Sequence, residues 1–260
     1  MITIVTFILG AIVGSFLNVV ALRWDLPRHG GASFAGRSRC VSCSKVLKWR
    51  ELIPILSFFL LRAKCSGCGT KISWQYPLVE LWTGLIFITI PYIFIPVFCL
   101  YIVITVYDFK HKIIPDELVY TSIILAILTS YLSAIALATV GFLLPTPFSL
   151  LDWLSGPILF IFFASIWFFS RGRAMGFGDA KLGLSVGLLL GASQGFSAIV
   201  LAFWLGAVSS VIYLCLNKIG FIKNAKKLTM KSEVPFAPFI IIGAWVSLAF
   251  HLNLFYVPLF

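Results

Sequence analysis

Apolar stretches long enough to cross a lipid bilayer dominate this sequence and most restrict what it can fold into. A membrane-spanning helix needs about 17 to 25 residues, and short or broken helices need fewer. Eight stretches qualify, at residues 2–22, 78–92, 95–107, 118–140, 151–170, 182–190, 196–216 and 236–254. Hydrophobic residues make up 60% of the chain and charged residues 11%, whereas soluble domains are roughly 45 to 50% apolar. The sequence therefore predicts an all-α, polytopic membrane bundle of about eight transmembrane helices.

Positive charge lies on one side of this predicted bundle. All twenty Lys and Arg residues fall in the segments 22–77, 108–117, 171–181 and 217–235. Because cytoplasmic loops of membrane proteins carry such an excess, we expect these segments to be cytoplasmic and both chain ends to lie outside. The net charge of +11 then reflects topology and contact with anionic membrane lipid, and not binding of a nucleic acid. The first positive charge is Arg23, so the first span is expected to be an uncleaved anchor.

Two Cys-x-x-Cys motifs lie in residues 23–76, the largest predicted extramembrane segment. They contain Cys40 with Cys43 and Cys65 with Cys68. Four thiolates at this spacing can surround one metal ion, usually structural zinc and less often iron. The alternative is two disulfides, which are rare in the reducing cytosol. A short polar segment builds little core of its own, and a metal commonly compensates, so we expect a small cytoplasmic zinc-knuckle domain.

Two of the nine acidic residues, Asp108 and Asp179, lie at one predicted depth, the cytoplasmic edge of the membrane. A carboxylate in a bilayer is costly, so each requires an explanation. Asp179 could cap a helix that begins at Ala180. Asp108 could be an interfacial charge neutralised by Lys110 or Lys112. Taken singly, neither residue requires more than these structural roles.

The segments around these aspartates, taken together, resemble a known family. "YDFKHKIIPDE" and "GFGDAKL" are similar to the two catalytic motifs of the Gly-x-Gly-Asp membrane aspartyl peptidases. The start "GAIVGSFLNVVALR", the double cysteine motif followed by "YPLVE", and the late "VPFAPF" narrow the resemblance to bacterial type IV prepilin peptidases. The resemblance covers nearly the whole chain, and the cysteine motifs with "YPLVE" are its specific part. Ala237 in "PFAPF" is a departure, because that family more often has Gly there.

This resemblance implies a bifunctional enzyme of the bacterial inner membrane. It implies that Asp108 and Asp179 remove the basic leader of prepilins and pseudopilins on the cytoplasmic face. The new N-terminus would then be methylated with S-adenosylmethionine. Two carboxylates held close together cannot both ionise, so one would act as base and the other as acid. Gly176 and Gly178 would support the catalytic loop by letting the backbone approach the substrate.

The methyl-transfer site has no recognisable fingerprint in the sequence. Glu51 and Glu80 are candidates because they are acids near the cysteine motifs and the membrane edge. Glu80 could instead complement the positive N-terminus of its helix.

The predicted organisation has four parts. They are a first transmembrane helix at 1–22, a four-cysteine metal-binding domain at 23–76, a transmembrane peptidase core at 77–216, and a loop with the last helix at 217–260. The alternative function is a membrane scaffold or transporter in which the acids are caps or ion sites. The sequence indicates no particular pilin substrate and no particular oligomeric state.

Overall fold

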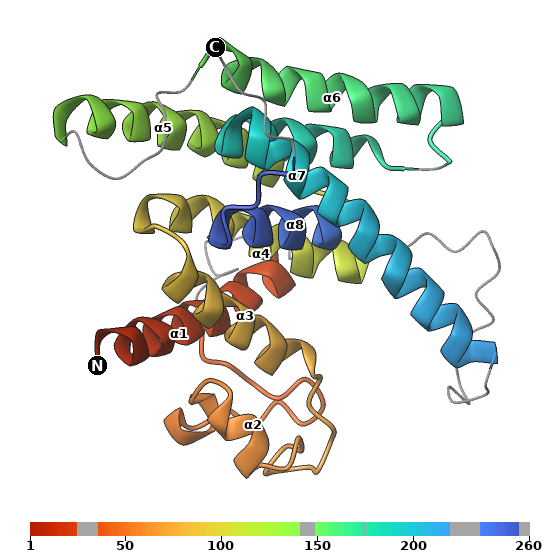
Figure 1. Cartoon of the computed structure of the whole chain (residues 1–260). Helices are drawn as coiled ribbons and strands as arrows, with labels where there is room; N and C mark the ends of the chain where they lie inside the picture. The colour runs from red at the N-terminus through yellow and green to blue at the C-terminus, as the bar shows by residue number, and fades with distance from the viewer. Residues whose placement is uncertain (25–35, 141–148, 174, 219–234, 255–260) are drawn as a thin grey trace. The chain divides into compact units, whose positions relative to one another are not determined.

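The computed structural model describes residues 1–24, 36–140, 149–173, 175–218 and 235–254. Within these residues every regular element is a helix, and two isolated β-bridges occur in the cysteine segment. The all-α class predicted from the sequence is therefore confirmed. The chain divides into two compact units, Met1–Val106 and Tyr107–Phe260, and the division falls inside α4 (Ile95–His111) (Figure 1).

The first unit joins two long helices through the cysteine segment. Its other elements in chain order are α1 (Ile2–Arg23), the 3-10 turn η1 (Trp49–Leu52), α2 (Leu56–Leu60), α3 (Gln75–Thr89) and the 3-10 turn η2 (Tyr92–Phe94). The helix α1 packs directly against α3. A Cβ at Gly10 would lie 2.8 Å from the side chain of Phe87, and one at Gly14 would lie 2.6 Å from the hydroxyl of Thr83. Small residues at this crossing let the two helices approach closely, as is common in membranes.

The second unit is centred on one long helix. This helix, α7 (Phe177–Lys218), contacts α5 (Asp116–Val140), α6 (Leu150–Ser170) and α8 (Ala237–Ala249). Figure 1 shows α5 and α6 beside the first half of α7. Ser130 of α5 donates its hydroxyl to the carbonyl of Leu188 at 2.7 Å, and Ser155 of α6 donates to that of Gly187 at 2.8 Å. Such interhelical hydrogen bonds each contribute roughly 0.6 kcal/mol in a membrane.

The helix α7 is broken at Gly191. This residue has φ 73° and ψ −172°, a conformation available essentially to glycine alone. The break frees the N–H of Ala192, which donates to Oδ1 of Asp152 at 2.9 Å. The predicted spans 182–190 and 196–216 lie on the two sides of this break, and Figure 1 shows the chain changing direction there.

The helices agree closely with the predicted apolar stretches. In the described part of the chain four helices are long and apolar enough to cross a bilayer, namely Ile2–Arg23, Tyr92–His111, Leu150–Ser170 and Phe177–Tyr213. Shorter apolar helices include α8, and the predicted stretches 78–92 and 118–140 coincide with α3 and α5 apart from a few terminal residues. The number of eight spans and the four-part division stay predictions. The predicted basic loops lie partly outside the described residues, at 25–35 and 219–234.

Candidate functional site

Asp108 lies in the last turn of α4 and is only 4% exposed. Its carboxylate accepts a hydrogen bond from the main-chain N–H of Ala237, the first residue of α8. The first N–H groups of a helix lack partners within it and favour a negative charge. The oxygen Oδ2 is buried without a hydrogen-bond partner among the described residues. Within the described residues neither Lys110 nor Lys112 forms an ion pair with Asp108. The interpretation of Asp108 as an interfacial charge neutralised by these lysines therefore finds no support.

Asp179 lies in the first turn of α7 and is 7% exposed. The helix begins at Phe177, which precedes the predicted start at Ala180, so Asp179 is not its N-cap. Its carboxylate accepts a hydrogen bond from the N–H of Gly176, which directly precedes the helix. An acidic residue at the third helical position commonly reaches back in this way. The predicted start at Ala180 was wrong. The Gly-Phe-Gly sequence at 176–178 is typical of a turn, but the helix includes Gly178, which packs against Ile114.

The carboxylates of Asp108 and Asp179 are close enough to interact electrostatically. Both residues belong to the second unit, and α4 and α7 bring them together from distant parts of the chain. A buried carboxylate is normally paired with a cation. Within the described residues neither of these has a basic partner. Two acids in one buried site is the arrangement that lets carboxylates share a proton.

The glycines near Asp179 make room for packing. A Cβ on Gly178 would lie 2.9 Å from Cβ of Ile114, which is closer than real side chains approach. At Gly176 the nearest atom would be Oδ2 of Asp179, at an ordinary 3.6 Å. Gly178 is therefore required for the close approach of α7 to the segment between α4 and α5.

Asp116 is the acid nearest in sequence to Asp108 that has a clear structural role. It stands in the first turn of α5 and pairs with Lys181 of α7 at 2.6 Å. Its side chain is 64% exposed, and an exposed ion pair contributes only about 0 to 1 kcal/mol. Asp116 thus provides a matched comparison for the two buried aspartates.

The two cysteine motifs fold into turns with the same hydrogen-bond pattern. In the first turn Cys40 donates its N–H to the carbonyl of Lys45 and accepts the N–H of Ser44. The second turn repeats both bonds at the same spacing from Cys65, and an antiparallel β-bridge closes each turn. The fifth residue of each turn has a positive φ, 56° at Ser44 and 71° at Gly69. The repeated sequence spacing therefore produces two equivalent knuckles.

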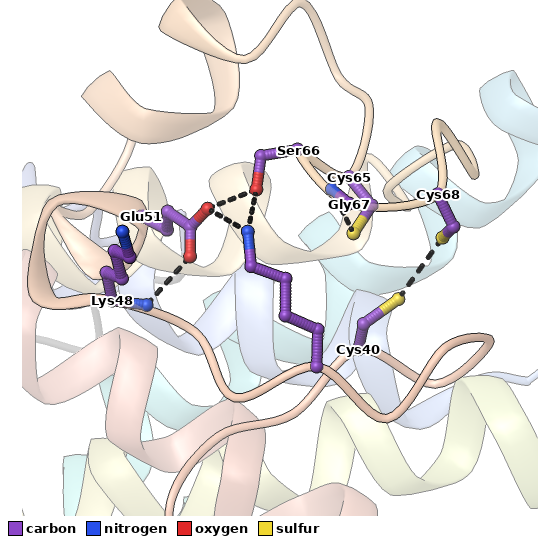
Figure 2. A network of polar contacts seen from close by, with 8 residues as sticks. Cys40, Lys48, Glu51, Cys65, Ser66, Gly67 and Cys68 are labelled. Atoms are coloured by element: carbon purple, nitrogen blue, oxygen red, sulfur yellow. Dashed lines mark hydrogen bonds and ion pairs between the residues drawn. The ribbon is translucent and has the colours of Figure 1, made fainter.

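The four cysteines of these knuckles converge. Their Sγ atoms all lie within 4.8 Å of one another. Those of Cys40 and Cys68 are 3.8 Å apart, and Figure 2 shows this pair together with Cys65. A tetrahedral zinc ion with Zn–S bonds of about 2.3 Å has S–S edges of about 3.8 Å. The four thiols are free and form no disulfide. The hydroxyl and N–H of Thr70 lower the pKa of Cys68 to about 6, whereas the neighbouring thiols of Cys40 and Cys68 raise the pKa of Cys43 to about 11. This donor set can hold one metal ion.

Glu51 connects the two knuckles (Figure 2). Its Oε1 accepts hydrogen bonds from the hydroxyl of Ser66 in the second knuckle and from Nζ of Lys45 in the first. Its Oε2 accepts the N–H of Lys48 at 2.7 Å. These three donors, Ser66 first, lower the pKa of Glu51 to about 2. The carboxylate is therefore charged and fully engaged in holding the metal-binding turns together.

Glu80 occupies a different environment, on α3 and only 7% exposed. Its Oε2 accepts the N–H of Ile55 at 2.7 Å, and the hydroxyl of Ser15 is also bonded to its carboxylate. Ile55 has a φ of 62°, which is a strained conformation for a β-branched residue. Glu80 thus fixes the start of α2 against α1 and α3. Glu80 and Glu51 both line a cavity of about 480 Å³ within the first unit.

Comparison with known proteins divides the chain at residues 93–94, in η2 directly before α4. Residues 8–94 match the bacterial peptidase A24 N-terminal domain, and residues 93–211 match the type IV leader peptidase family. A prepilin leader peptidase/N-methyltransferase of Stutzerimonas stutzeri is 30% identical over 93% of this chain and 88% of its own length. The chain belongs to the type IV leader peptidase family.

Other relatives of this family agree with that assignment. A type 4 prepilin-like proteins leader peptide-processing enzyme of Escherichia coli is 30% identical over 78% of this chain and 82% of its own length. A prepilin leader peptidase/N-methyltransferase of Myxococcus xanthus is 33% identical over 80% of this chain, which spans 62% of that relative. No solved structure matches the chain.

The leader peptidase match includes Asp108 and Asp179, and the N-terminal match includes the four cysteines, Glu51 and Glu80. Ala237 lies beyond both matches. Sequence reasoning noted Ala237 only as a departure from the family and missed its hydrogen bond, because a main-chain donor has no side-chain signature. It also missed the hydrogen bonds of Lys45 and Ser66 to Glu51. The position of these two residues within the cysteine turns could have indicated such a role.

Proposed function

We propose that Asp108 and Asp179 are the catalytic pair of a membrane aspartyl endopeptidase that removes leader peptides from type IV prepilins and pseudopilins. The observation that carries this proposal is the burial of two interacting carboxylates, without a basic partner among the described residues, inside the leader peptidase match. The relatives are named for the same reaction. A proton-sharing pair can supply both the base and the acid for peptide hydrolysis without a covalent intermediate.

In the proposed mechanism the two aspartates exchange roles during each turnover. The charged carboxylate takes a proton from a water molecule that attacks the scissile carbonyl. The protonated carboxylate donates a hydrogen bond to the carbonyl oxygen and polarises it. The proton taken from the water then passes to the amide nitrogen as the C–N bond breaks, and the amine leaves. The N–H of Ala237 holds Asp108 in a fixed orientation, and the buried Oδ2 of Asp108 is the atom available to the water.

The substrate and its side of the membrane follow from charge and depth. A basic leader followed by an apolar helix would lie with its leader in the cytosol and its helix in lipid. Asp108 ends one apolar helix and Asp179 begins another, so both suit a bond at the membrane edge. We place the enzyme in the bacterial inner membrane with its catalytic face toward the cytoplasm.

We also propose zinc as the metal held by Cys40, Cys43, Cys65 and Cys68. Four sulfur ligands in a closed set are typical of structural zinc, which contributes folding energy and takes no part in chemistry. The knuckles lie in the first unit and the aspartates in the second. Loss of zinc should therefore affect methylation more than cleavage.

N-methylation of the new N-terminus is the second proposed activity, as the relatives' names indicate. S-adenosylmethionine supplies a methyl group on a positively charged sulfur. The carboxylates near the knuckles, Glu51 and Glu80, are the candidate residues to bind such a cation. Lys45 already neutralises Glu51, whereas Glu80 has no basic partner in the described part of the chain.

The proposed peptidase is tested with purified protein in detergent and a synthetic prepilin, with products read by mass spectrometry. The wild type should cut after the leader. Asp108→Asn and Asp179→Asn should each abolish cleavage while folding and zinc content stay near wild type, because an amide can neither carry the charge nor exchange the proton. Asp116→Asn is the matched control and should retain most activity.

The same assay separates the rival class of function, a scaffold or cation transporter. Such a protein would not cut the substrate in any form. Robust cleavage by either Asn variant of the buried pair would overturn its catalytic assignment and leave Asp179 as a residue of the helix start.

A further inference from the structure

The outer face of α2 exposes large apolar side chains. Leu56, Phe59 and Leu60 are all exposed there, and Leu60 is 71% exposed. The opposite face of α2 is covered, because Ser57 and Phe58 line the cavity of the first unit. A helix on the surface of a soluble domain normally presents polar residues outward, and neighbouring exposed apolar side chains mark a site of interaction with protein or membrane. The outer face of α2 therefore does not have the composition of a surface that faces water.

This apolar face adjoins the lipid-facing side of α3. Trp74, the N-cap of α3, contacts Phe59 of α2 with the ring centroids 6.4 Å apart, and Figure 1 shows α2 next to the start of α3. Trp74, Leu78 and Leu81 are exposed and follow one another at spacings of four and three, so they lie on one side of α3. Exposed leucines of a membrane-spanning helix contact lipid, and residues 78–92 are one of the predicted spans. The apolar surface therefore extends from the lipid-facing side of α3 onto α2.

Basic and aromatic residues flank α2 on both sides in the sequence. Arg62 follows the helix, and Arg50 precedes it in η1 with its guanidinium 5.2 Å from the ring centroid of Trp49. All three of these residues are exposed. Glu51 is the single acid in residues 36–76. Exposed Lys and Arg are attracted to anionic lipid, and tryptophan prefers the boundary between lipid and water. The charge and the aromatic residues thus both match the surface of an anionic membrane.

We propose that the outer face of α2, together with Trp74, docks the cysteine segment onto the surface of the bilayer that the chain spans. The apolar side chains lie among the acyl chains, and Arg50 and Arg62 lie at anionic lipid headgroups. Lipid is favoured over a protein partner because the same apolar surface continues onto a membrane-spanning helix. Docked in this way, α2 holds one wall of the cavity and keeps the cysteine knuckles at the membrane surface. The inference depends on neither of the proposed enzymatic activities.

A fluorescent amino acid incorporated in place of Leu60 reports what covers this face. The matched control carries the same probe in place of Val41, an apolar residue of the first knuckle that is 94% exposed. The full chain is placed in nanodiscs of phosphatidylethanolamine and phosphatidylglycerol. Quenching by nitroxide-labelled lipid is compared with quenching by iodide in the water. The probe at position 60 should be quenched by the lipid and shielded from iodide, and the probe at position 41 should show the reverse.

The contribution of charge is tested in the same nanodiscs. One basic residue near an anionic surface favours the docked state by about fivefold. Arg62→Gln should therefore lower the ratio of lipid quenching to iodide quenching at position 60 by about fivefold. Replacing both lipids by phosphatidylcholine removes the anionic headgroups and should lower this ratio further. A ratio that stays the same in phosphatidylcholine would overturn the assignment to anionic lipid.

Two results at position 60 would overturn the docking proposal itself. Quenching by iodide without quenching by lipid would show that α2 faces water. Shielding from both quenchers would show that protein, either a partner or a second copy of the chain, covers this face. The thermal unfolding midpoint is recorded for each labelled protein, and if the probe at position 60 prevents folding, it is moved to the exposed Leu56. Because the readout is contact with lipid, the result stands apart from the tests of cleavage and methylation.

Discussion

The main-chain N–H of Ala237 donates a hydrogen bond to the carboxylate of Asp108. Through this bond the N-terminus of α8 supports a buried acid at the end of α4. The position of α8 is in turn set by α7, because Gly243 packs so closely that a Cβ there would collide with the carbonyl oxygen of Ala198. The candidate catalytic pair therefore depends on a helix outside both family matches.

The first prediction concerns this support. Gly243→Ala should displace α8 from α7, move the N–H of Ala237, and lower the cleavage rate on the order of 10- to 100-fold. Gly206→Ala is the control, since its Cβ would lie 3.6 Å from the nearest atom; it should stay active and gain up to about 1 kcal/mol of helix propensity. Rates on a synthetic prepilin and unfolding midpoints are measured for both. Equal activity of the two variants would contradict a role for α8 in the site.

A second prediction concerns the start of α7. Gly178→Ala should force Ile114 and α7 apart, because the added Cβ would lie 2.9 Å from Cβ of Ile114. Such overpacking lowers the free energy of unfolding by about 1 to 3 kcal/mol. Because Asp179 is displaced with the helix, the variant enzyme should lose most of its cleavage activity. Gly195→Ala has its nearest contact at 3.4 Å and should behave as wild type in the same cleavage assay. A fully active Gly178→Ala enzyme would show that the aspartates tolerate this displacement.

The third prediction concerns metal retention. Any of Cys40, Cys43, Cys65 or Cys68 changed to Ser should lose bound zinc, because a closed four-sulfur site needs all of its ligands. Elemental analysis of purified protein measures the loss. Detection of disulfides and no metal in the wild type would refute the site itself.

Glu51 provides a graded version of that metal test. Glu51→Ala leaves the Ser66 hydroxyl without its acceptor and the Lys45 ammonium with only Oγ of Ser66. Zinc affinity measured by chelator competition should therefore fall about 10- to 100-fold. Lys64→Ala changes another lysine of the same segment and should retain zinc like the wild type. If Glu51→Ala held zinc equally well, the carboxylate would not be what joins the knuckles.

The fourth prediction concerns orientation in the membrane. A reporter that is active only outside the cytoplasm should be active when fused after residue 260, and inactive when fused to a chain ending at Gly69. The physical reason is the concentration of all Lys and Arg residues in four segments on one side. The opposite pattern would place Asp108 and Asp179 at the outer face and exclude a cytosolic leader as their substrate.

The sequence by itself determined the features that depend on local pattern. Hydropathy alone indicated an all-helical membrane protein, because an apolar run must satisfy its backbone within a helix when water is absent. The repeated Cys-x-x-Cys spacing predicted four converging thiols, because each short turn already holds two sulfurs on one side. The hydropathy pattern also separated residues 182–190 from 196–216, and the helix breaks between these stretches at Gly191.

Only the tertiary structure decided how distant segments complete the sites. The true start of α7 at Phe177 depends on packing of Gly178 against Ile114, which no local pattern records. Asp108 gained its partner from the backbone of Ala237, and Glu80 gained its partner from the strained Ile55. Main-chain donors are the same in every residue except proline, so sequence cannot show which of them a folded chain will direct at a buried carboxylate.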